Sequence, residues 1–176
     1  MRHAMLGMIF VTSTVMSGAV QPPAGTPPAG TSAAKKHPVL ATYEYTKKAV
    51  IAAAEAMPAE HYSMRANGEA RSFADLVAHS VLTNFGVCAG ARKETNPKSG
   101  QRFEGEVTAK AELVDLLKAS FEYCDVPFAA AIGETGTDLT FAISHNNRML
   151  GSMELYLRMQ GLAIEGSEIN KPAPKK

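Results

Sequence analysis

Residues 144–161, SHNNRMLGSMELYLRMQG, decide the fold, because apolar residues recur at helical spacing through the whole stretch. At 100° per residue, the apolar side chains from position 141 onward fall on one contiguous arc of a helical wheel. This arc contains Phe141, Ala142, Met149, Leu150, Met153, Tyr156 and Leu157. The residues outside it are Asn147, Arg148, Glu154 and Arg158. His145 lies inside the arc, so we predict a helix from about Asp138 to Gly161 with His145 pointing inward.

Three more amphipathic segments precede this one. The first covers about 38–57 and ends at Pro58, which cannot continue a helix. The second begins after Ser72 and the third after Thr108, both of which are good N-cap residues. Four amphipathic helices of about 20 residues, with no convincing strand, predict an all-α four-helix bundle.

The connection 94–107, ETNPKSGQRFEGEV, is long enough to cross an end of the bundle. It would let the second and third helices run in the same direction. Cys88 and Cys124 lie in the later parts of these two helices, and an even cysteine count in an exported protein suggests a disulfide. A Cys88–Cys124 bond fits parallel neighbours, whereas the alternative is two buried free thiols.

The N-terminus has the layout of a signal peptide. Arg2 and His3 form a short basic start, the apolar stretch AMLGMIFVTSTVM follows, and SGA at 17–19 supplies small residues for cleavage. An uncleaved anchor is the alternative, but this stretch is shorter than the roughly 20 apolar residues that a spanning helix needs. We therefore expect an exported protein, periplasmic or secreted, with no membrane span after cleavage.

The domain boundaries follow from composition. Residues 1–19 are the predicted signal peptide, and 20–36, in which PPAGT occurs twice, form a predicted disordered linker. The bundle should cover 37–164 and a flexible tail 165–176. The chain has 176 residues and a net charge of +1, which argues against a nucleic-acid binder because such proteins normally carry a basic face.

Three stretches resemble one known family. They are RSFADLVAHSVLTNFGVCAGARKETNP, KAELVDLLKASFEYCDVPF and HNNRMLGSMELYLRMQGL, the last with a YLRxxG ending. Over about 45–164 they are similar to the DinB/YfiT-like superfamily, in particular to its exported branch. The resemblance implies a four-helix bundle with a crossing connection. It also implies one divalent metal held by three histidines, one from the second helix and two from the fourth at i and i+4.

On this chain the family's metal positions fall on His79, His145 and Met149. A thioether is a soft, weak ligand for zinc, nickel or manganese, so the site that the resemblance implies is degenerate. Met149 as a core residue is the alternative to Met149 as a ligand. For His79 the alternatives are a surface pair with Asp75 at i, i+4 and a ligand oriented by a carboxylate.

The function predicted on this basis is a DinB-like binding or structural module, with no cofactor or a weakly bound zinc or nickel ion. One alternative is a metal-dependent enzyme, a thiol-dependent transferase or isomerase, with a third ligand from His61, Asp75 or Glu44. A copper protein using two imidazoles and a thioether is a weaker alternative. The predicted partner is a small molecule or a protein that the sequence does not identify. A homodimer is an alternative that the sequence does not decide.

Overall fold

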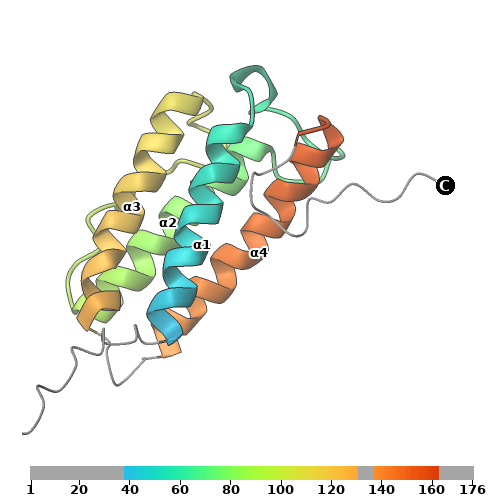
Figure 1. Ribbon diagram of the computed structural model, residues 1–176. Helices are drawn as coiled ribbons and strands as arrows, with labels where there is room; N and C mark the ends of the chain where they lie inside the picture. Colours follow the sequence, from blue (N-terminus) through green and yellow to red (C-terminus); the bar gives the residue numbers. More distant parts are fainter. Residues whose placement is uncertain (1–37, 131–136, 163–176) are drawn as a thin grey trace, which may run out of the picture. The chain divides into compact units, whose positions relative to one another are not determined.

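The computed structural model describes residues 38–130 and 137–162, which contain four α-helices (Figure 1). They are α1 (Pro38–Ala56), α2 (Phe73–Arg92), α3 (Lys110–Ala130) and α4 (Thr137–Met159), with a 3-10 turn at Ala59–His61. Within these ranges the structure has no β-strand, only an isolated bridge between Arg65 and Ser72. The helices contact one another in the cyclic order α1, α3, α2, α4. The predicted all-α four-helix bundle is confirmed.

The predicted signal peptide 1–19, linker 20–36 and tail 165–176 lie outside the described residues. The predicted bundle, 37–164, is described over 38–130 and 137–162. No helix in these two ranges has the length and apolarity needed to cross a membrane.

The start of α2 is fixed by a capping box. Ser72 Oγ accepts a hydrogen bond from the Asp75 backbone N–H at 3.1 Å, and Asp75 Oδ2 accepts one from the Ser72 N–H at 3.1 Å. Both backbone donors would otherwise be unpaired at a helix start. The Ser72 prediction is confirmed. By contrast, α3 begins at Lys110, so Thr108 lies two residues before the helix and does not occupy the adjacent N-cap position.

Helices α2 and α3 run in the same direction. Asn84 Nδ2 donates to Ser120 Oγ at 3.0 Å, and one turn further along both helices Cys88 and Cys124 lie at disulfide distance, with Cα atoms 5.3 Å apart. Both pairs are separated by 36 residues, and such a constant offset occurs only between parallel elements. The parallel arrangement and the cysteine pairing agree with the sequence prediction.

The connection between α2 and α3 runs back along α2 rather than across an end of the bundle. Phe103 of this connection is buried in the core, and Lys98 Nζ lies 5.9 Å from the centre of the Phe85 ring on α2. The Gly105 N–H donates to Asp75 Oδ1 at 2.8 Å. Gly105 has φ +77°, a backbone conformation that favours glycine. The connection is therefore attached to the first turn of α2.

A polar layer joins three helices inside the core. Asn146 Nδ2 on α4 donates to Asn84 Oδ1 at 2.7 Å, and Asn84 in turn donates to Ser120. This layer explains where the helical-wheel prediction for α4 was wrong. Phe141 is 53% exposed and Glu154 is buried, because the inward face of α4 includes polar residues that an apolar arc leaves out.

Asp75→Asn should destabilise the bundle, because the amide cannot replace both charged oxygens. Burial alone raises the pKa of Asp75, but hydrogen bonds from Ser72 and Gly105, with the charge of Arg65, lower it overall. Because its pKa is lower in the folded state, the ionised Asp75 carboxylate stabilises the fold at pH values above its unfolded pKa of about 3.9. This contribution is lost as the pH falls through the folded pKa.

Urea unfolding between pH 3 and 7, followed by circular dichroism, measures this effect. We expect Asp75→Asn to lower the free energy of unfolding at pH 7 by about 1–3 kcal/mol. The difference should shrink as the pH falls below about 4. Asp115→Asn, at an exposed position on α3, is the matched control. A difference that stays constant over the whole pH range would contradict this role of Asp75.

Candidate functional site

The two histidines singled out by the sequence lie side by side. His79 on α2 and His145 on α4 have ring centroids 5.0 Å apart. His145 is buried, as predicted, whereas the side chain of His79 is 26% exposed. Helical periodicity left the orientation of His79 open, and the packing of α2 against α4 decides it.

The partner of His79 is Glu104 rather than Asp75. His79 Nδ1 lies 2.5 Å from Glu104 Oε1, and Glu104 Oε2 accepts from Arg71 Nε at 3.1 Å. A carboxylate oxygen is the acceptor in such a contact, so Nδ1 is engaged with Glu104 and Nε2 is the ring nitrogen outside this contact. Glu104 belongs to the connection between α2 and α3. The spacing of residues within α2 therefore does not predict Glu104 as the partner of His79.

His145 lies among an aromatic ring, a hydroxyl and two arginines. Its Nε2 is 3.1 Å from Thr83 Oγ1, and its ring centroid is 5.5 Å from that of Phe141. Burial lowers the pKa of His145, and electrostatic interaction with His79, Arg148 and Arg71 lowers it further. The imidazole is therefore kept neutral around pH 7.

Met149, one turn after His145, is a buried residue and also a wall of a hollow of about 500 Å³. The turn before α2 supplies Arg71 to this hollow, and α4 supplies Arg148 and Tyr156. Tyr156 Oη donates to the Arg71 carbonyl and accepts from the Ala66 N–H at 2.9 Å, which fixes the rim. The hollow thus lies beside the histidine pair, between α4 and the start of α2.

Three side chains were proposed as a third metal ligand, and His61 among them lies in the 3-10 turn after α1. Asp75 is held in the α2 cap by Ser72, Arg65 and Gly105, and Glu44 lies in the hollow between α1 and α3. In the part of the chain that the structure describes, no group of three His, Cys, Asp or Glu side chains could hold a metal ion.

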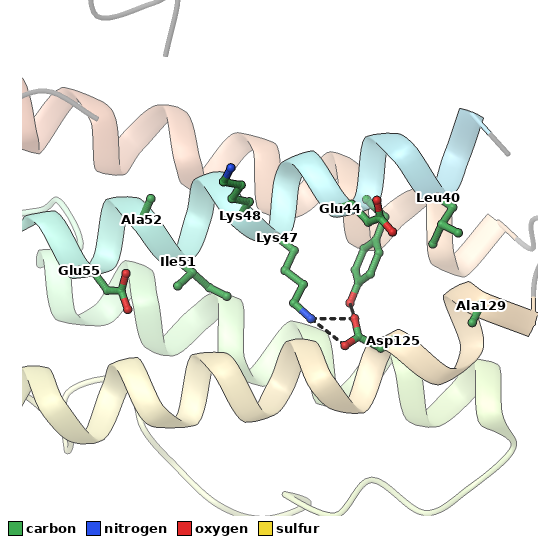
Figure 2. A pocket seen from close by; sticks show the side chains of 10 residues that line it. Leu40, Glu44, Lys47, Lys48, Ile51, Ala52, Glu55, Asp125 and Ala129 are labelled. Carbon is green, nitrogen blue, oxygen red and sulfur yellow. Dashed lines mark hydrogen bonds and ion pairs between the residues drawn. The ribbon is translucent and has the colours of Figure 1, made fainter. Parts of the chain in front are cut away.

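A larger hollow, of about 690 Å³, lies on the opposite side of the bundle between α1 and α3 (Figure 2). Figure 2 shows Lys47 of α1 reaching Asp125 of α3. Lys47 Nζ lies 2.7 and 2.9 Å from the two carboxylate oxygens of Asp125, and Tyr43 Oη donates to Oδ1 at 2.9 Å. Glu55, at the other end, pairs with Lys118 at 2.6 Å. These charges are matched within the chain and tie α1 to α3, so we assign this hollow a structural role.

Comparisons of the chain with protein-family models, with curated proteins and with solved structures gave no match. The resemblance to the DinB/YfiT-like superfamily therefore stays a prediction from the sequence.

The pKa of His145 is a direct test of this environment. We expect a histidine NMR titration to place it below the usual value of about 6.5, and Arg148→Gln to move it upward by removing one positive charge. Because the folded state disfavours protonation, stability should fall as the pH drops from about 6.5 to the folded pKa. His145→Gln should remove this slope, whereas the control His61→Gln should retain it. A His145 pKa above 6.5 would show that the ring is not in this environment.

Proposed function

We propose that this chain is an exported DinB-like four-helix bundle that binds a small molecule beside a degenerate metal site. The observation that carries the proposal is the position of Met149. The resemblance assigns this residue to the place of the family's third histidine, one turn after His145, and Met149 also lines the hollow next to the histidine pair. The position that the resemblance gives to a metal ligand thus forms a wall of a hollow, which supports a binding role over a metal centre.

The donor set does not fit the metal that the family implies. Catalytic zinc sites use three protein ligands and an open position for water, whereas this site offers two imidazoles and a thioether. His145 Nε2 also lies at hydrogen-bond distance from Thr83 Oγ1. We therefore assign no chemical step to a metal at this site.

Export is supported by two independent features. The sequence of residues 1–19 has the layout of a signal peptide, and Cys88 and Cys124 lie at disulfide distance. Disulfides persist in oxidising compartments and are rare in the cytosol. Together these features favour a periplasmic or secreted protein.

One observation favours the metal-dependent enzyme as a second candidate. Metal-binding histidines commonly donate their other ring N–H to a carboxylate, and His79 does so to Glu104. This pairing would present Nε2 of His79 as a donor atom. A metal ion bound there would still need a third protein ligand, which none of the contacts described above supplies.

Metal content after equilibration with zinc or nickel, followed by gel filtration in a competing buffer, separates the two candidates. We expect the unmodified chain to retain far less than one ion per chain. Met149→His should raise the affinity at least 10–100-fold, because it restores a third imidazole beside His79 and His145. Met159→His, at an exposed position on the same helix, is the matched control and should have no effect.

Stoichiometric zinc in the unmodified chain would contradict the binding-module proposal and favour the enzyme. Copper that is retained by the unmodified chain and lost in Met149→Leu would instead favour the copper-binding alternative. If Met149→His binds no more metal than Met159→His, the placement of the family site on His79 and His145 is wrong.

A further inference from the structure

We propose that the hollow beside His145 binds a small amphipathic anion, with its oxyanion head on Arg71 and Arg148 and its apolar body against Met149. This inference rests on the proposed function, because it names the ligand class of the same pocket. The inference concerns the charge of the ligand, and the proposal of a binding pocket does not depend on it.

The charges of the hollow point to an anion. Arg71 and Arg148 are the only charged residues among the described residues that line it. Arg148 forms no ion pair within 38–130 and 137–162. Arg71 contacts Glu104 through Nε alone, so its terminal nitrogens stay available. Arg148 has no acid partner among the described residues, and the Glu104 contact engages only Nε of Arg71. Both guanidinium groups are therefore suited to a carboxylate or phosphate, which arginine can bind bidentately.

The contrast with the other hollow strengthens this assignment. Between α1 and α3, Lys47 is paired with Asp125 and Glu55 with Lys118, so these charges are neutralised within the chain. In the hollow beside His145, Arg71 is paired with Glu104 of the connection, whereas Arg148 has no acid partner among the described residues. The missing negative charge is the contribution that we assign to the ligand.

The remaining walls suit an apolar body. Leu76 of α2 and Met149 and Leu155 of α4 line the hollow, and Leu155 is 52% exposed. The volume of about 500 Å³ lies in the range of small-molecule sites, which combine apolar walls with a few polar groups that set orientation. Tyr156 holds the Arg71 backbone through its carbonyl, so this arginine is presented from a fixed point.

Titration of the full oxidised chain with four eight-carbon probes tests the inference. The probes are octanoate, octyl phosphate, octan-1-ol and octylammonium, and binding is followed by NMR shifts of the residues that line the hollow. We expect the two anions to bind, and the anion that binds more tightly identifies the preferred head group. The alcohol and the ammonium ion should bind at least tenfold more weakly than the anions. Binding of the anions should weaken as salt is added.

Arg148→Gln should weaken anion binding about tenfold or more, since one charge-assisted contact is lost. It is the cleaner variant because Arg71→Gln also removes the contact with Glu104. Arg102→Gln, which removes the same charge at an exposed position of the connection, is the matched control and should bind as the unmodified chain does. Thermal melting checks that each variant is folded.

Octanol binding as tightly as octanoate would overturn the anion inference and leave the pocket proposal standing, as would an Arg148→Gln variant with unchanged affinity. No binding by any of the four probes would overturn both. The metal measurement on Met149→His is independent of these results, so the two failures can be told apart.

Discussion

The carboxylate of Asp75 is the interaction on which the rest of the structure depends. It accepts hydrogen bonds from the Ser72 N–H, from Arg65 and from the Gly105 N–H, at 2.8 to 3.1 Å. These donors belong to the start of α2, to the turn before it and to the connection that leads to α3. Ser72 is buried, and a buried donor that loses its partner costs about 1–3 kcal/mol. With the further contacts to Arg65 and Gly105, a single side chain joins three segments.

The site follows from this constraint. With Gly105 held against the first turn of α2, its neighbour Glu104 lies beside His79 and contacts Arg71. The arginine in turn lines the hollow next to His145. The connection is therefore one side of the functional site as well as a link between two parallel helices, and its length has a structural reason.

Much of the fold could be predicted from the sequence because the deciding signals are local. Apolar periodicity within each helix predicts four helices, and Ser72 predicts the start of α2. The spacing of Cys88 and Cys124 agrees with parallel neighbours, and periodicity gives the inward direction of His145. Each of these inferences needs only residues within one helix or a covalent pairing rule.

The partner of His79 could not be predicted in this way. Glu104 lies 25 residues further along the chain, and Asp75, the candidate at i, i+4, is held in the helix cap. The wheel of α4 was misplaced at Phe141 and Glu154 for a similar reason, since the inward face of this helix includes Asn146, which pairs with Asn84 of α2. Side-chain pairing across elements depends on tertiary packing, which single-helix periodicity does not contain.

The most direct test of this account is NMR of Asp75→Asn, with hydrogen exchange at the Gly105 amide and the ¹⁵N shifts of the His79 ring as the two readouts. We predict that the Gly105 amide is protected in the unmodified chain and exchanges faster in the variant. The His79 ring shifts should change in the variant as well, although the partner of that ring is Glu104 and not Asp75. Unchanged His79 shifts alongside a Gly105 amide that exchanges equally fast in both proteins would contradict this account.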